Sequence, residues 1–170
     1  MQTSLSAKLF RETLAVDPCS TVGALGLLLL RAITGSLVFY IHGWHKLLGG
    51  IDYLRYGTPW KLVEEVSSMH FPAPVFSSFA ATGVQFVCAA LLIPGFCTRL
   101  NALLLTGALS TAVLQNLLAG RDPQLALLYT LNVVSLVLVG GGRFSLDAWL
   151  TRSEPPRTSI HPAALKTNLT

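Results

Sequence analysis

Residues 100–120, LNALLLTGALSTAVLQNLLAG, carry no charged side chain between Arg99 and Arg121. A hydrocarbon core is crossed by about 20 residues of helix, so this stretch is long enough to span a membrane. The neighbouring stretches 66–98 and 123–142 are also free of charge and rich in apolar residues. The pattern therefore predicts at least three transmembrane helices, one in each of these stretches.

The composition of the whole chain supports this interpretation. Of the 170 residues, 52% are hydrophobic and only 12% are charged, whereas soluble domains carry about 25% charged residues. A soluble domain this small has too much surface to leave so few charges on it. A disordered chain and a disulfide-rich secreted domain are likewise excluded. The net charge of +4 then concerns topology and anionic lipid headgroups, and we predict no nucleic-acid partner.

A fourth apolar stretch lies earlier in the chain and contains one charge, Arg31. Short connections at Pro94-Gly95 and at residues 121–123 make consecutive helices antiparallel neighbours. We expect an all-α membrane protein whose four transmembrane helices form an up-down bundle within residues 22–150. The expected spans are about 22–44, 75–95, 100–119 and 124–141.

The basic residues predict the orientation of this bundle in the membrane. Seven lie on the side that would hold both termini and four on the other, with Arg31 left out. The positive-inside rule then places both termini in the cytoplasm. We expect residues 1–21, which lack the apolar core of a signal peptide, to form a cytoplasmic segment. Residues 151–170 would form a flexible cytoplasmic tail.

The loop between the first two spans has its own helical pattern. Pro59 suits the first position of a helix, and Trp60, Val63, Val66 and Met69 recur at helical spacing. Polar residues occupy the other faces of this expected helix. This pattern predicts a short interfacial helix in the first periplasmic loop.

Arg31 is expected near the middle of the first helix, where a charge costs about 2.5–3.5 kcal/mol on insertion scales. None of the acidic residues falls within the other spans. The expected partners are therefore neutral polar side chains, namely those of Gln85, Asn101, Gln115, Asn116 and Asn132. The alternative is that Arg31 reaches the cytoplasmic headgroups along its own helix.

His42 shares a helix face with Arg31 and lies near the outer membrane surface, beside Trp44 and Lys46. These side chains could bind the head of a quinone or an anion, or they could be ordinary interfacial anchors. The helix is expected to end at Leu47-Leu48-Gly49-Gly50. His42 and His45 are three residues apart, but no carboxylate or Cys completes a metal site, and we predict none.

Three stretches of the chain resemble sequence motifs of the DoxX family. The first runs from Arg31 and Gly35 to HGWHKL at residues 42–47, and the second is PGFCTRLNA at 94–102. The third is GRFSLD at 142–147, similar to the closing motif of the family. The family positions found here are Arg31, His42, Gly43, Lys46, Arg99, Arg143 and Asp147.

The resemblance implies a four-helix protein of the bacterial inner membrane, an accessory or quinone-linked subunit of a membrane oxidoreductase system. The quinone or anion site would comprise Arg31, His42, Trp44, Lys46 and Gln85, with no covalently bound cofactor. A redox partner subunit or a homo-oligomer is also implied. Gln85 and Gln124 stand where members often have acidic residues, so Gln85 can form hydrogen bonds but cannot take up a proton. The alternative function is a non-catalytic scaffold or small-molecule permease.

Overall fold

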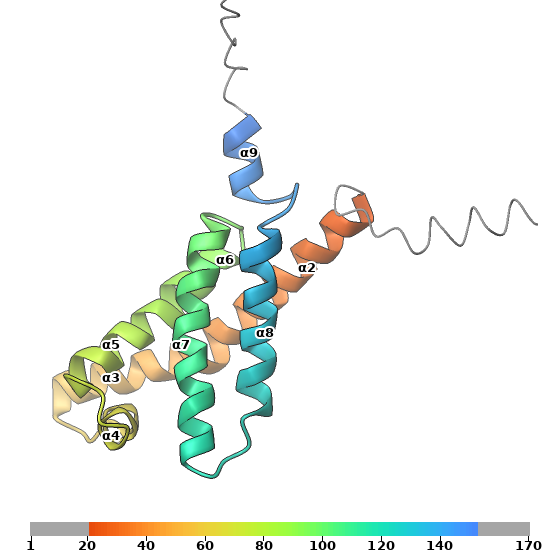
Figure 1. The fold of residues 1–170 in the computed structure, drawn as a ribbon. Helices are drawn as coiled ribbons and strands as arrows, with labels where there is room; N and C mark the ends of the chain where they lie inside the picture. Colours follow the sequence, from red (N-terminus) through yellow and green to blue (C-terminus); the bar gives the residue numbers. More distant parts are fainter. Residues whose placement is uncertain (1–20, 153–170) are drawn as a thin grey trace, which may run out of the picture.

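The computed structural model describes residues 21–152, which form helices and turns without any strand (Figure 1). Predictions made for residues 1–20 and 153–170 lie outside the described residues. The long helices slant past one another in Figure 1, while α7 and α8 run side by side in opposite directions. The helices are α2 (Thr21–Leu37), η1 (Val38–Trp44), α3 (His45–Tyr56), α4 (Lys61–Ser68), α5 (Pro74–Gly83), η2 (Val84–Cys88), α6 (Ala89–Leu92), α7 (Thr98–Leu118), α8 (Gln124–Val139) and α9 (Leu146–Arg152).

The first long helix is continuous from Thr21 to Tyr56, through α2, η1 and α3. It therefore continues past Gly49-Gly50, where the sequence interpretation ended it, and that prediction is wrong. The helix ends at Gly57, whose φ of 66° is left-handed and whose amide donates to the carbonyl of Tyr53 at 3.1 Å. A glycine accepts this backbone conformation without the steric cost of a side chain.

Gly49 and Gly50 instead form the surface on which α4 packs. A Cβ at Gly49 would lie 2.9 Å from the indole nitrogen of Trp60, and one at Gly50 would lie 3.0 Å from the ring of Phe79. Trp60 precedes α4 and is buried with Leu62 and Val66 of that helix. The helix expected in the first loop is therefore present, and its apolar face is held against α3 and α5.

The second long helix runs from Pro74 to Leu92 through α5, η2 and α6. Two glycines of the first helix let it approach closely. A Cβ at Gly43 would lie 3.1 Å from the Cα of Phe86, and one at Gly35 would lie 2.9 Å from the carbonyl oxygen of Ala89. The two π-helical segments, η1 and η2, consequently pack directly on each other.

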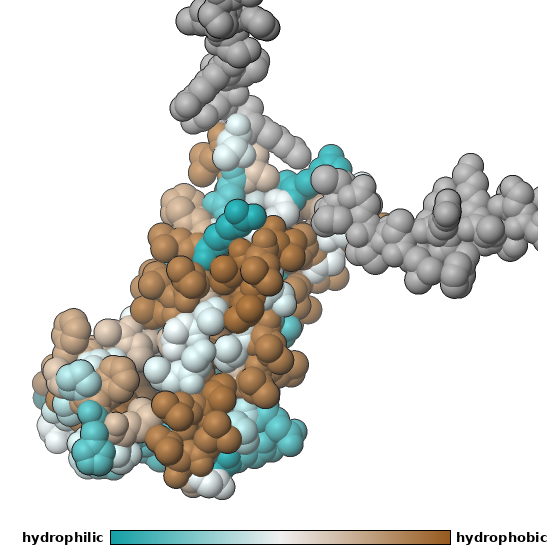
Figure 2. All heavy atoms as spheres, viewed as in Figure 1, coloured by the Kyte–Doolittle hydropathy of each residue, from teal (hydrophilic) through white to brown (hydrophobic). Residues whose placement is uncertain are grey.

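The helices α7 and α8 complete the core. Their inward residues Leu105, Leu109, Val133 and Leu136 are buried together with Val38 of η1. Outward-facing residues are mostly large and apolar, and Figure 2 shows them as broad hydrophobic surfaces over the middle of the molecule. Among the described residues, three helices are long and apolar enough to cross a membrane, and α8, with 16 residues, is shorter.

The chain after α8 turns back onto the helices and then forms a further short helix. Gly140 and Gly142 have φ values of 85° and 75°, which turn the backbone sharply. The helix α9 then begins at Leu146, and the amide of Leu146 donates to the carbonyl of Pro94 at 3.2 Å. This segment packs against the turn between α6 and α7 (Figure 1).

Candidate binding site

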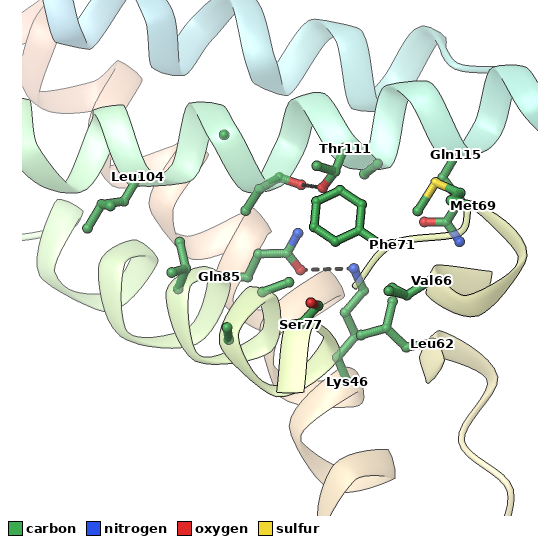
Figure 3. Close-up of a pocket in the computed structure, with 16 residues that line it drawn as sticks. Lys46, Leu62, Val66, Met69, Phe71, Ser77, Gln85, Leu104, Thr111 and Gln115 are labelled. Atoms are coloured by element: carbon green, nitrogen blue, oxygen red, sulfur yellow. Dashed lines mark hydrogen bonds between the residues drawn. The ribbon is translucent and has the colours of Figure 1, made fainter. Parts of the chain in front are cut away.

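Lys46 and Gln85 meet where the first two long helices cross. The ammonium of Lys46 donates to Oε1 of Gln85 at 3.0 Å, and the Gln85 side chain is 1% exposed (Figure 3). Gln85 belongs to the π-helical segment η2, and Lys46 follows η1 by two residues. Single π-helical turns occur frequently at functional sites because they displace side chains from regular helical positions.

An apolar cavity of about 230 Å³ opens beside this pair. Lys46, Gln85 and Gln115 supply its main polar groups, and small residues of α7 such as Gly107 and Ala112 form one wall. Figure 3 shows Phe71 projecting across the space between α7 and the loop after α4. The other labelled residues of its lining are Leu62, Val66, Met69, Ser77, Leu104 and Thr111.

A second, more polar cavity of about 270 Å³ is lined by the same pair. Lys46, Gln85, Ala112 and Gln115 line both cavities, so the Lys46–Gln85 pair stands at their common boundary. The imidazole of His42 lines the polar cavity and lies edge-on to Tyr129, with 5.6 Å between the ring centres.

Glu65 of α4 supplies the carboxylate of the polar cavity. It accepts hydrogen bonds from the amide of Gln115 and from Nη2 of Arg121, the latter at 3.1 Å. Glu65 also attracts the ammonium of Lys46. The sequence interpretation missed Glu65, Gln115 and Arg121 as site residues. The sequence offers three acidic residues in the first loop, Asp52, Glu64 and Glu65, as possible partners of Arg121, and nothing in it singles out Glu65.

Of the residues predicted for this site, His42, Lys46 and Gln85 come together, whereas Trp44 does not. Trp44 is 44% exposed and lies against Phe86, with 6.2 Å between the ring centres. The wider π-helical turn of η1 changes the phase of the helix, because it holds more residues per turn. Lys46 therefore faces inward, and His45 is exposed.

Arg31 lies at the opposite end of the molecule from the two cavities. Fifteen residues separate it from Lys46, roughly 22 Å along a helix that rises about 1.5 Å per residue. Its side chain is 1% exposed. Nη1 donates to the carbonyl of Gly141 at 2.8 Å, and Nη2 donates to the carbonyl of Phe144. The hydrogen bonds expected between Arg31 and neutral polar side chains such as Gln85 are thus absent, because backbone carbonyls at this end accept from Arg31, whereas Gln85 lies beside Lys46.

Asp147 joins Arg31 in what we call the Arg31 cluster, formed by Arg31, Gly95, Gly141, Phe144 and Asp147. The Asp147 carboxylate accepts from the amides of Cys97 and Thr98, at 2.6 and 2.8 Å, where α7 begins. Unpaired amides at the start of a helix bind a carboxylate well. The cluster thereby connects α2, the turn before α7 and the segment after α8.

The two remaining arginines of the motif stretches lie at this same end. Arg99 is exposed, and a Cβ at Gly140 would lie 3.3 Å from its Nε. Arg143 is also exposed and lies in the segment that leads to α9. Gln124 begins α8 at the other end, where its amide donates to Asp122 at 2.9 Å.

Comparison with known proteins gives one positive result. The sequence model of the DoxX family matches residues 26–117, which is more than half of the chain and includes most of the first long helix, all of the second and nearly all of α7. No curated protein and no solved structure matches the chain significantly.

Proposed function

The chain belongs to the DoxX family and is a multi-pass membrane protein, and from this premise we propose that it binds a membrane quinone at the Lys46–Gln85 pair. In this proposal it serves as an accessory or quinone-linked subunit of a membrane oxidoreductase system. The observation that carries the proposal is that this pair, a half-buried Lys46 and a buried Gln85, lines both an apolar and a polar cavity.

The chemistry of the pair fits a quinone headgroup. A quinone presents two carbonyl oxygens, which need hydrogen-bond donors. Lys46 has three N–H donors and the bond to Gln85 uses one of them. The Gln115 side chain lines both cavities and adds an amide to the same boundary.

The apolar cavity fits the hydrophobic tail of the same ligand. Leu62, Val66 and Leu104 line it, and a tail in contact with them would leave only the headgroup near polar atoms. A bound quinone supplies a carrier of two electrons and two protons. The residues of this chain would bind and orient the quinone. The imidazole of His42 and the carboxylate of Glu65 would be the polar groups beside its headgroup.

The electrons that reduce the quinone would come from a partner subunit, because the side chains of Lys46, Gln85 and Gln115 can bind ligands but are not redox-active. A redox partner subunit or a second copy of the chain therefore belongs to the proposal. The proposed location is the bacterial inner membrane, with both termini in the cytoplasm. Lys8, Arg11, Arg99, Arg143, Arg152, Arg157 and Lys166 would then face that side.

Binding of a short-chain ubiquinone or menaquinone analogue to the purified protein tests the proposal. Quenching of tryptophan fluorescence reports binding. For Lys46→Met we expect a dissociation constant raised about 10-fold to 100-fold, because a hydrogen bond from a charged group is worth about 1.5–3 kcal/mol. Gln85→Leu should also weaken binding.

Lys61→Met is the matched control, because Lys61 is exposed on α4 and lines neither cavity. It should bind the analogue like the unchanged protein. Circular dichroism of each variant verifies that it is folded. Unchanged binding in folded Lys46→Met and in Gln85→Leu would exclude this quinone site.

A non-catalytic scaffold is the second candidate, and the Arg31 cluster favours it. Residues of the family motifs at that end form hydrogen bonds that hold segments of the chain together, which requires no chemistry. A protein of this kind, or a small-molecule permease, would show no quinone binding and no redox turnover with its partner complex.

A further inference from the structure

A third cavity, of about 470 Å³, lies beside the Arg31 cluster and is separate from the two cavities described above. It is bounded by the middle of α2, the turn after α6 and the segment that leads into α9. We call it the basic cavity. Its lining includes Arg31, Arg143, Leu28, Ile93, Leu146 and Trp149.

The charge of Arg31 is only partly compensated by the protein. Two of its nitrogens donate to backbone carbonyls, but the Nε–H is buried without an acceptor. A buried donor without a partner costs about 1–3 kcal/mol. The neighbouring Asp147 carboxylate is engaged by two backbone amides at the start of α7. An anion in the basic cavity would complete the charge balance of this guanidinium.

The local excess of positive charge also favours the binding of an anion in the basic cavity. Of the charged residues that the structure describes here, Arg31 and Arg143 line the cavity, and the nearby acidic residue is Asp147. Two guanidinium groups therefore border one space. Guanidinium groups recognise phosphate well, because several N–H donors can reach its oxygens together.

The remaining walls indicate where such an anion comes from. Leu28, Ile93 and Leu146 are apolar. Trp149 is 65% exposed and Phe144 is 49% exposed, as aromatic residues are at the boundary between lipid and water. A free anion gains nothing from apolar walls, whereas a phospholipid places acyl chains beside them and its phosphate near the arginines.

We propose that the basic cavity binds the phosphate of an anionic phospholipid headgroup, with the exposed Arg143 as its ligand and the buried Arg31 contributing positive charge from the cavity wall. Basic pockets between transmembrane helices are known to bind such headgroups on the cytoplasmic side. The proposal is independent of quinone binding, because the basic cavity shares no lining residue with the two cavities beside Lys46 and Gln85.

Native mass spectrometry of the delipidated protein with added phosphatidylglycerol tests the proposal. Phosphatidylcholine and glycerol phosphate serve as the zwitterionic and lipid-free probes. We expect phosphatidylglycerol to be retained and the other two to be lost. In Arg143→Gln, retention should fall about fivefold, which corresponds to about 1 kcal/mol for one basic residue near an anionic lipid.

Arg99→Gln is the matched control. It removes the same charge from the same end, but Arg99 does not line the cavity, and retention should stay unchanged. An equal loss in both variants would overturn the proposal, because the lipid would then respond to surface charge alone. Equal retention of phosphatidylcholine would overturn it as well. Equal binding of glycerol phosphate would support a phosphate site but overturn the assignment to lipid.

Discussion

Arg31 illustrates how a charged residue is accommodated in this helix. A guanidinium removed from water needs partners for its N–H groups, and backbone carbonyls supply two of them, at Gly141 and Phe144. These carbonyls are available because the segment after α8 turns at glycines and forms no regular helix there. Arg31 therefore contributes to the position of the last segment of the described chain.

A substitution at Gly95 tests whether the packing of Arg31 stabilises the fold. Its φ of 74° is left-handed, and a Cβ there would collide with Nη1 of Arg31. Gly57 has a similar φ of 66°, but a Cβ there meets open space. Left-handed backbone costs a non-glycine residue about 1–2 kcal/mol, and overpacking adds about 1–3 kcal/mol.

We therefore expect Gly95→Ala to lower the melting temperature of the detergent-solubilised protein clearly more than Gly57→Ala does. Thermal unfolding followed by circular dichroism measures both variants. Equal decreases would show that Arg31 is not tightly packed against Gly95.

The sequence shows that Arg31 needs partners, but it does not show which ones. Side chains such as Gln85 can be named from the sequence, whereas a backbone carbonyl is present at every position and has no signature. Only the fold shows that the carbonyls of Gly141 and Phe144 are left without helical partners near Arg31. The same holds for Glu65, which reaches Arg121 only because α4 folds back over the helices.

At the scale of elements, the attachment of α4 determines the shape of the apolar cavity. Leu62 and Val66 of α4 line that cavity, and Glu65 of the same helix borders the polar one. The helix is held in place by Trp60 against Gly49 and Gly50. This contact requires the absence of a side chain at both glycines.

Gly49→Ala is expected to loosen α4. The new methyl group would approach the Trp60 indole to 2.9 Å, so the indole must shift. Hydrogen exchange should then become faster at residues 61–68. Gly26→Ala is the matched control on α2, where a Cβ meets nothing within 4 Å, and replacement there should leave exchange in α4 unchanged. Equal exchange in both variants would contradict the docking role of Gly49.

The gaps between charged residues predict the positions of the helices well, because lipid-facing segments cannot carry charges at low cost. The predicted end of the first helix is wrong, since a glycine pair occurs in turns as well as at sites of close helix packing. Gly49 and Gly50 serve packing, and Gly57 ends the helix. The π-helical segments η1 and η2 were not predictable, since an inserted residue has no local sequence signal.

At the scale of the whole molecule, the two ends differ in chemistry. One holds the cavities around Lys46 and Gln85, and the other holds the Arg31 cluster and the basic cavity. We propose that the Arg31 end lies in the cytoplasm, because the positive-inside rule favours the side with more basic residues. The quinone site would then lie toward the outer surface of the membrane.

Reporter fusions test this orientation. A reporter that is active only in the cytoplasm should be active after Thr170, and one that is active only outside should be active in the turn at Gly120-Arg121. The rule favours this result because more basic residues lie beside the termini than beside that turn. The reverse pattern of activity would invert the proposed topology.

The most direct measurement of the central claim is photolabelling with a short-chain azidoquinone, followed by mass spectrometry of the labelled peptides. We predict labels in residues 62–71 of α4 and its following loop and in residues 104–115 of α7, which line the apolar cavity. Excess unlabelled quinone should remove these labels, and Lys46→Met should reduce them. Labels confined to the Arg31 end, or labels that excess quinone does not displace, would contradict quinone binding at the Lys46–Gln85 pair.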